Sequence, residues 1–256
     1  MSRKKFFWLI LSLILVFIFY FHTTTREWSQ DLGRHLRLGE VISKEHYLPR
    51  TNLFSYTSPD FPFTNHHWLA EVVFYQVFSL GGDRALVAFK VLLFLLAFGI
   101  IFFLVVDEEN AFLSFTALLL PLLVFRERTD VRPEIFGFFF FALYLLVFAK
   151  SHRGEKRWLY LLPICQAFWV NAHLSFVFGD LLLVAYFFSL WREKKLFSRQ
   201  SIPVVLAILA NLVNPYGLRG ALAPFLIWEN YGYEIAENQS IFFFGRLWRF
   251  SQHLLF

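Results

Sequence analysis

A polar segment at residues 31–71 organises this chain. It reads DLGRHLRLGE at residues 31–40, PRTNLFSYT at 49–57 and HHWLAE at 66–71, and it holds four of the eight histidines. It is the longest polar stretch in an otherwise apolar sequence, and it follows closely on a hydrophobic run at 6–22. We therefore expect this segment to carry the functional residues and the apolar helices around it to hold it in place.

The composition indicates a membrane protein. Hydrophobic residues make up 57% of the chain and charged residues 17%, and the mean hydropathy is +0.52. Soluble domains have about 45–50% apolar and roughly 25% charged residues, so the apolar excess here requires lipid rather than a larger core. The net charge of +5 does not point to nucleic acid, because the basic residues sit in short loops between apolar runs. We expect an all-α, polytopic transmembrane fold in which residues 1–256 form one module.

Apolar runs predict about seven spanning helices. They lie at Phe6–His22, Ala85–Val106, Phe112–Phe125, Ile135–Ala149, Trp158–Val170, Leu174–Trp191 and Ile202–Val213. A further run, Trp68–Leu80, stops at Gly81-Gly82, and a broken piece lies at Ala221–Trp228. Several runs are short for a bilayer, so charge is a better guide to topology than length.

Two basic loops, residues 150–157 and 192–199, carry four Lys or Arg each. Together with Arg3-Lys4-Lys5 they are expected on the cytoplasmic side, which requires an even number of crossings before Lys150. Trp68–Leu80 therefore belongs to a long first external loop, residues 23–84, as a membrane-parallel or re-entrant helix. The predicted protein is therefore a multi-pass membrane protein with a cytoplasmic amino terminus. Residues 229–256 are expected to be an incomplete carboxyl-terminal part.

The external segment offers carboxylates and imidazoles at helical spacing. Asp31 and His35 are four residues apart and share one face if Ser29–Ser43 is helical, and His67 and Glu71 repeat the spacing. A helix-end carboxylate explains Asp31 without catalysis, and polar tips at a helix start explain the second pair, so both interpretations stay open. Asp31, Glu71 and His66 are chemically reasonable ligands of a divalent cation, Mg²⁺ or Mn²⁺, although no established metal-binding spacing is present.

The predicted topology places three later motifs on the same, external face of the membrane. They are Arg132-Pro133-Glu134, Asn171-Ala-His173 and Asn214-Pro-Tyr216-Gly217. The Arg132 guanidinium suits the phosphate of a lipid-linked ligand, although an interfacial arginine is the alternative. Asn171 and His173 are candidates for substrate binding or for structure, and Asn214 and Tyr216 are typical of a helix break. Polar motifs that converge between helices predict a site there.

These motifs together resemble the GT-C glycosyltransferases, which include protein O-mannosyltransferases, aminoarabinose transferases and oligosaccharyltransferases. The resemblance rests on Asp31-x-x-x-His35-x-x-x-Gly39, the 49–57 block, His66-x-Trp68-Leu-x-Glu71 and the three later motifs. It implies transfer of a sugar from a polyprenyl-phosphate donor to an acceptor on the external face. An early acidic residue in the first external loop, here Asp31, is then the base, a metal ligand or both. A direct displacement would invert the anomeric centre.

Two other classes remain open from the sequence. One is a degenerate or truncated relative that binds the lipid carrier or assists assembly without catalysis, and the other is a transporter. Transporters tend to place charges near the bilayer midplane, whereas the polar residues here cluster at helix ends. The sequence leaves the sugar, the acceptor, the metal and the oligomeric state undetermined.

Overall fold

The computed structural model describes residues 3–23, 31–106, 109, 112–113, 116–117 and 130–226. The chain divides into two units at residues 1–224 and 225–256, and nearly all of the second unit lies outside the described residues. The predicted run Phe112–Phe125 and the segment 229–256 also lie largely or wholly outside them.

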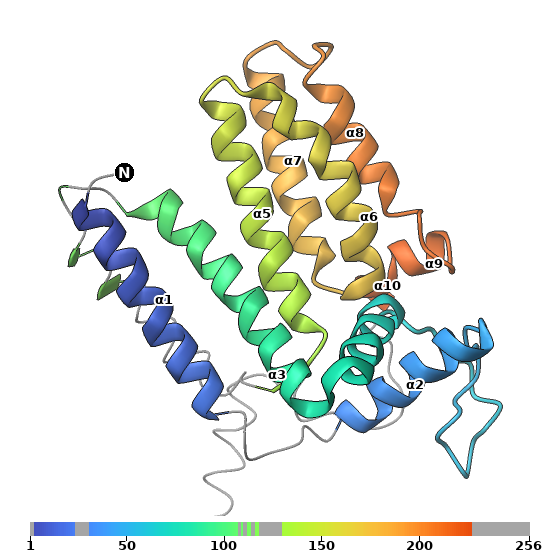
Figure 1. The fold of residues 1–256 in the computed structure, drawn as a ribbon. Coiled ribbons are helices and arrows are strands. Elements are labelled where there is room, and N and C mark those ends of the chain that lie inside the picture. The colour runs from blue at the N-terminus through green and yellow to red at the C-terminus, as the bar shows by residue number, and fades with distance from the viewer. Residues whose placement is uncertain are drawn as a thin grey trace, which may run out of the picture. The chain divides into compact units, whose positions relative to one another are not determined.

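The described residues are helical, as predicted, and contain no strand beyond one isolated bridge between Thr51 and Pro62. Figure 1 shows the helices in chain order. They are α1 (Arg3–Thr23), α2 (Leu32–Glu45), α3 (Trp68–Val105), α5 (Glu134–His152), the 3-10 helix η2 (Lys156–Leu161), α6 (Leu162–Ala172), α7 (Phe176–Arg192), α8 (Ser201–Ala210), α9 (Leu218–Ala221) and α10 (Ala223–Leu226).

The helix α3 is broken in the middle, where the sequence predicts a stop. Gly81 and Gly82 have non-helical backbone angles, and Gly82 has φ 62° and ψ −148°. Residues other than glycine almost never adopt this combination of φ and ψ angles. The first part of α3 therefore turns away from the second, as Figure 1 shows, and packs against α2.

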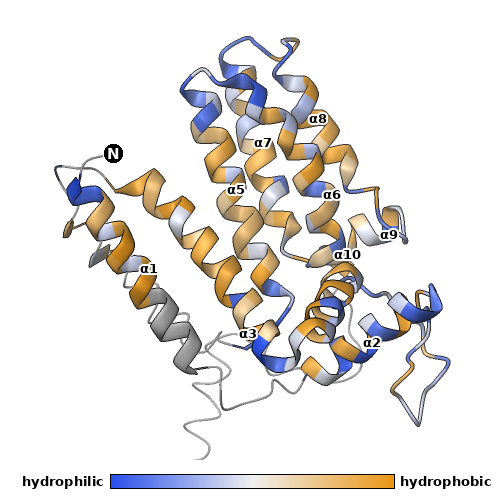
Figure 2. Ribbon diagram, in the orientation of Figure 1, coloured by the Kyte–Doolittle hydropathy of each residue, from blue (hydrophilic) through white to orange (hydrophobic). Residues whose placement is uncertain are grey.

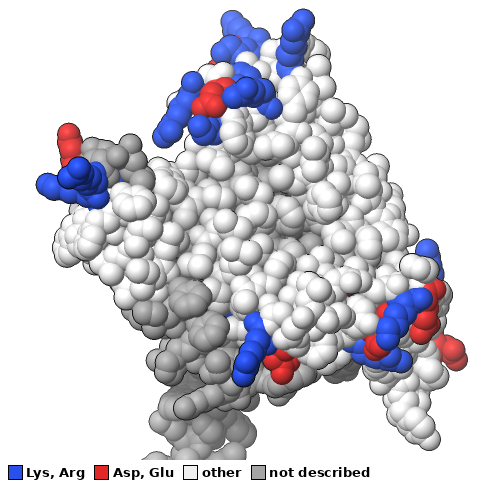
Figure 3. All heavy atoms as spheres, in the orientation of Figure 1, with Lys and Arg blue, Asp and Glu red and all other residues white. Residues whose placement is uncertain are grey.

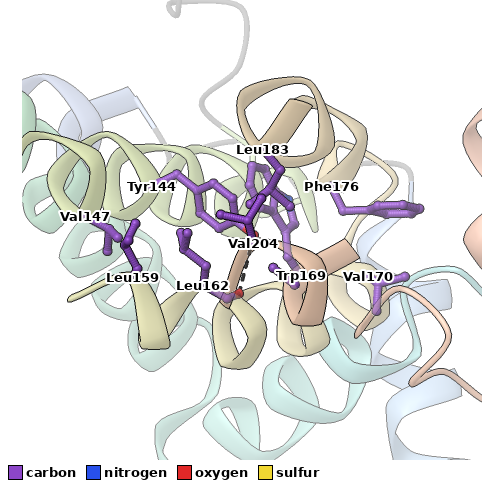
Figure 4. Close-up of a cluster of buried hydrophobic side chains, with 10 residues drawn as sticks. Tyr144, Val147, Leu159, Leu162, Trp169, Val170, Phe176, Leu183 and Val204 are labelled. Carbon is purple, nitrogen blue, oxygen red and sulfur yellow. Dashed lines mark hydrogen bonds between the residues drawn. The ribbon is translucent and has the colours of Figure 1, made fainter. Parts of the chain in front are cut away.

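Helices α5 to α8 lie alongside one another in a bundle (Figure 1). Their core is built from Tyr144, Trp169, Leu183 and Val204, each fully buried, and Figure 4 shows these side chains pointing toward one another. The α-helical part of the predicted run Trp158–Val170 begins only at Leu162, because Pro163 has no N–H to donate to the preceding turn. The residues before it form η2 instead.

The two ends of this bundle differ in chemistry. The loops 150–157 and 192–199 lie together at one end, the basic end, and Figure 3 shows Lys and Arg gathered there. The start of α5, the turn between α6 and α7, and residues 211–217 lie at the other end beside α2, which we call the polar end. Figure 2 shows apolar helix surface between the two ends.

Two of the described helices, α3 and α5, are long and apolar enough to cross a membrane. Large apolar side chains are also exposed along α7, among them Phe178, Leu181 and Phe188, as expected of a lipid-facing surface. Both observations support association with a membrane. Helices α6, α7 and α8 have 11, 17 and 10 residues, shorter than the roughly 20 residues of a perpendicular span. About seven crossings therefore stays a prediction.

Replacing Gly82 by alanine tests the break in α3. A β-carbon at Gly82 meets no atom within 4 Å, so the backbone angle is the sole source of strain. We expect Gly82→Ala to lower the free energy of unfolding by about 1–3 kcal/mol, measured by denaturation followed by circular dichroism. Gly99→Ala, in the same helix, is the control, since its β-carbon makes only ordinary contacts. Equal stability of the two variants would contradict a strained break.

Candidate functional site

A fully buried contact at the polar end joins α2 to the first part of α3. His35 Nδ1 lies 2.8 Å from Glu71 Oε1, and the side chains are 4% and 0% exposed. One turn along α2, Gly39 packs so tightly that a β-carbon would collide with the backbone carbonyl of Glu71. Gly39 therefore allows the two helices to approach until the imidazole and the carboxylate meet.

Asn65 completes the surroundings of the buried carboxylate. Its amide donates from Nδ2 to Glu71 Oε2, its Oδ1 accepts from the backbone N–H of His67, and its own backbone N–H donates to the Tyr216 hydroxyl at 3.0 Å. Both oxygens of Glu71 thus have donors, which a fully buried carboxylate requires. With a carboxylate bonded to Nδ1, the proton of neutral His35 is on Nδ1 and Nε2 is an acceptor.

Asp31 lies one helical turn before His35 and remains accessible. It occupies the position before α2, makes no side-chain capping bond, and its side chain is 48% exposed. Arg34 approaches its carboxylate at 3.7 Å. Asp31 and His35 therefore differ: the imidazole is fixed inside the contact between α2 and α3, while the carboxylate can meet a molecule from solution.

Three imidazoles form a row across the polar end, which we call the histidine row: His35, His67 and His173. The ring centroid of His67 is 5.8 Å from that of His35 and 5.3 Å from that of His173. Burial lowers the pKa of His67 well below its usual value and that of His173 to about 4, and the neighbouring imidazoles add to the effect. His67 and His173 are therefore uncharged at neutral pH.

The turn after α6 fixes His173. Its Nδ1 accepts from the backbone N–H of Ser175 at 3.1 Å and lies 2.8 Å from the Ser175 hydroxyl, which in turn accepts from Trp169 Nε1. Nε2 is then the protonated nitrogen of the neutral ring. Gly137 of α5 leaves room for this turn, because a β-carbon there would collide with Ser175 Oγ.

His66 and residues of two later motifs, those at 171–173 and 214–217, line a small cavity. Its walls include His66, Asn171, Asn214 and Tyr216. Trp68 Nε1 donates to Asn171 Oδ1 at 2.7 Å, so the start of α3 is bonded to the end of α6. Burial, and next the charge of Arg219, lower the pKa of His66 to about 4.

The turn at residues 130–134, just before and at the start of α5, carries Arg132 and Glu134. Arg132 Nε lies 3.6 Å from Asp130 Oδ2, and Glu134 occupies the first turn of α5, where a carboxylate is favoured. The neighbouring Val131 shares a buried apolar cluster with Leu32 at the start of α2. Arg132 therefore belongs to the same end of the molecule as Asp31.

The residues predicted as metal ligands do not come together. Asp31 is exposed beside Arg34, His66 lines the small cavity, and Glu71 is occupied by His35 and Asn65. Among the described residues, no group of three or more His, Cys, Asp or Glu side chains fits a metal ion. The donor set on these residues therefore does not fit a divalent cation, and no chemical step is assigned to one.

The structure brings the predicted site residues to one end of the molecule, near three residues that the sequence did not indicate. All ten predicted residues lie at the polar end: Asp31, His35, His66, Glu71, Arg132, Glu134, Asn171, His173, Asn214 and Tyr216. The sequence did not single out Asn65, Trp68 or Lys90 as site residues. Lys90 is fully buried in the second part of α3 and attracted by Asp130, and a lone lysine inside an apolar run was the available signal.

Comparison of this chain with protein-family models, with curated proteins and with solved structures found no match.

Replacing Gly39 by alanine tests the contact between α2 and α3. The new β-carbon would collide with the Glu71 carbonyl and reach 2.9 Å from Tyr75 Cβ, so α2 must move away. We expect a loss of about 1–3 kcal/mol in the free energy of unfolding. Gly33→Ala in the same helix meets no atom within 4 Å and is expected to be neutral or stabilising. A stable Gly39→Ala protein would contradict the close approach.

Acid should destabilise the folded chain through the buried imidazoles. The pKa values of His66 and His173 fall to about 4, whereas unfolded histidine titrates near 6.5. The unfolded chain therefore binds more protons between these values, so stability is full above pH 6.5 and declines toward pH 4. We expect the melting temperature to fall by roughly 5–10 °C from pH 7 to pH 5.

A matched pair of variants tests whether the buried imidazoles cause this loss of stability in acid. In His173→Asn, the amide oxygen can still accept from Ser175, so the turn is kept while the titrating group is lost. This variant should show a smaller decline than wild type. His152→Gln, at an exposed position, should not change it. Equal slopes in all three proteins would mean that the buried imidazoles do not cause the effect.

Proposed function

We propose that this chain is a multi-pass membrane glycosyltransferase of the GT-C type. It transfers a sugar from a polyprenyl-phosphate donor to an acceptor on the external face of a bacterial plasma membrane. The observation that carries the proposal is the accessible carboxylate of Asp31 at the start of α2, a helix that the buried pair of His35 and Glu71 fixes one turn further on. The reaction needs such an accessible carboxylate on a fixed helix, with a guanidinium near it, which Arg34 supplies at 3.7 Å.

In the proposed reaction Asp31 acts as general base. It takes the proton of the acceptor hydroxyl while the acceptor oxygen bonds to the anomeric carbon. The bond from that carbon to the phosphate oxygen breaks, and the phosphate leaves with the electron pair. A carboxylate within hydrogen-bonding reach of the hydroxyl typically contributes about 10²–10⁴-fold in rate. One displacement inverts the anomeric centre.

Arg132 is the proposed partner of the departing phosphate. Negative charge grows on the phosphate as the bond breaks, and a guanidinium stabilises it with two parallel N–H donors. Asp130 lies near both Arg132 and Lys90, and Glu134 follows in the first turn of α5, so two cations and two carboxylates gather there. Within this group, the planar guanidinium of Arg132 is the side chain that matches the oxygens of a phosphate.

Glu71 and His35 are assigned a positioning role instead of direct contact with the sugar. Glu71 is fully buried, and His35 is held by it. Neutral His67 and His173 supply polar atoms without net charge beside this pair. The cavity lined by His66, Asn171, Asn214 and Tyr216 has a volume of about 10 Å³, which is room for about one water molecule, so the proposed sugar lies outside it, on the side of Asp31.

Replacing Asp31 by asparagine tests this function. The side chain keeps its size and loses its basicity, so transfer of labelled sugar from polyprenyl-phosphate hexoses by purified protein should fall about 10²–10⁴-fold. Asp60→Asn, also exposed in the same segment, is the control and should keep full activity. Transfer at the wild-type rate by a folded Asp31→Asn enzyme would remove Asp31 from the mechanism.

Binding without transfer would favour the alternative of a non-catalytic carrier-binding protein. In that case the wild-type chain binds polyprenyl phosphate, Arg132→Ala weakens the binding, and no sugar is released or transferred. Under the proposed reaction, Arg132→Ala instead lowers the transfer rate more than it lowers donor affinity, because the phosphate carries more negative charge in the transition state than in the bound donor.

A further inference from the structure

A cavity in the described part of the chain lies at the basic end, away from the proposed reaction at the polar end (Figure 1). It has a volume of about 480 Å³ and opens between the ends of α5 and α7. Sites for small ligands are commonly about 300–1,000 Å³. Nothing in the proposed sugar transfer uses this cavity.

The cavity has an apolar wall and a polar interior. Phe148, Ala149 and Leu190 form the wall. Phe148 stacks on Tyr186 at 4.9 Å, and the Tyr186 hydroxyl is held by Ser151 Oγ at 2.9 Å and Gln200 Oε1 at 3.4 Å. The lining is therefore preformed, with hydrogen-bonding groups fixed beside apolar surface.

Cations surround the mouth of the cavity. The loops 150–157 and 192–199 contain eight Lys or Arg and two Glu. Glu155 is paired with Lys150 at 3.0 Å, and Glu193 with Lys195 at 2.7 Å. Six cations in these described loops then have no carboxylate partner, and Lys156, one of the six, lines the cavity beside His152. Figure 3 shows the resulting concentration of positive charge at this end.

We propose that this cavity binds the head group of an anionic phospholipid from the cytoplasmic leaflet. The phosphate lies at Lys156 and His152, and the first part of an acyl chain follows the wall of Phe148, Ala149 and Leu190. The proposal rests on the membrane orientation proposed above and is independent of sugar transfer.

An amphiphile fits this cavity better than a soluble anion does. The apolar wall continues onto exposed apolar surface of α7, where Phe188 and Trp191 are 55% and 57% exposed. Aromatic side chains of this kind are enriched at the level of lipid head groups. A soluble phosphate would leave the wall in contact with water, whereas a lipid covers the wall and pairs its charge with Lys156.

Glu193 is the one carboxylate in the lining, and its charge acts in opposite directions on anionic and zwitterionic head groups. Its hydrogen bond to Lys195 lowers its pKa, and the charges of Lys195, Lys156 and His152 lower it further, so it is ionised at neutral pH. An anionic head group is repelled by this carboxylate, whereas the amine of a zwitterionic head group is attracted. Removing its charge therefore separates the two kinds of lipid.

The test measures lipid binding to the purified full chain in neutral detergent by native mass spectrometry. The probes are dioleoylphosphatidylglycerol and, with the same acyl chains, dioleoylphosphatidylcholine. Both lipids carry the phosphate, but phosphatidylcholine adds a quaternary ammonium that the cations at the mouth repel, so we expect wild type to bind the anionic lipid about tenfold more tightly. His152→Gln/Lys156→Gln should abolish this preference, and Arg153→Gln/Arg157→Gln, which removes two exposed cations outside the lining, should largely keep it.

Two further variants separate a cavity from a charged surface. Ala149→Leu fills the wall without changing charge and should weaken binding of the anionic lipid. Glu193→Gln should strengthen it about two- to fivefold, as expected for an exposed charge pair. Circular dichroism at increasing temperature shows whether each variant is folded, and a variant that is not folded is replaced by Ala149→Val or Lys156→Met.

Several outcomes would overturn the proposal. Equal losses in the two double variants would show general charge attraction, and an unchanged Ala149→Leu protein would show that the cavity is not used. Glycerol 1-phosphate competing as well as the lipid would make the occupant a soluble anion, and weaker binding in Glu193→Gln would indicate a zwitterionic head group. Because the lining lies at the other end from Asp31, sugar transfer by the lining variants stays near the wild-type rate, so each proposal can fail without the other.

Discussion

The buried contact between His35 and Glu71 is the interaction on which the polar end of this molecule depends. A fully buried carboxylate is costly unless its oxygens are paired, and here His35 and Asn65 supply the donors. The same Asn65 bonds Tyr216 through its backbone, so the requirement to satisfy one carboxylate ties α2, α3 and the segment after α8 together. Gly39 makes the contact possible by admitting the backbone of α3.

Separation of charge along the bundle is the second feature of the structure. The polar end holds the acid, the histidine row and Arg132, and the basic end holds two loops rich in Lys and Arg. The surface between them is apolar (Figure 2). A bilayer placed around this apolar surface puts the two ends in different aqueous compartments. The proposed sugar transfer and the proposed lipid site then act on opposite leaflets and need not interfere.

Several sequence-based predictions agree with the structure because their signals are local. The Gly-Gly pair breaks α3 because Gly82 takes backbone angles that other residues avoid. The i, i+4 spacings predicted helical segments, and α2 indeed covers Leu32–Glu45, although residues 24–30 lie outside the described part. The spacing also suggested that Glu71 works with His67. Instead Glu71 turns to His35 and Asn65, because the crossing of α2 on α3 decides which side chains meet.

By itself, the sequence determined the helical class, the apolar character, the break in α3 and which polar motifs belong to one end. Hydropathy, glycine pairs and loop charge act over a few residues, so they can be read along the chain. Only the tertiary structure decided the partners. His35 meets Glu71 across 36 residues, Trp68 meets Asn171 across 103, and Asn65 meets Tyr216 across 151. Such contacts depend on the rotation and crossing of packed helices, which no local pattern in the sequence specifies.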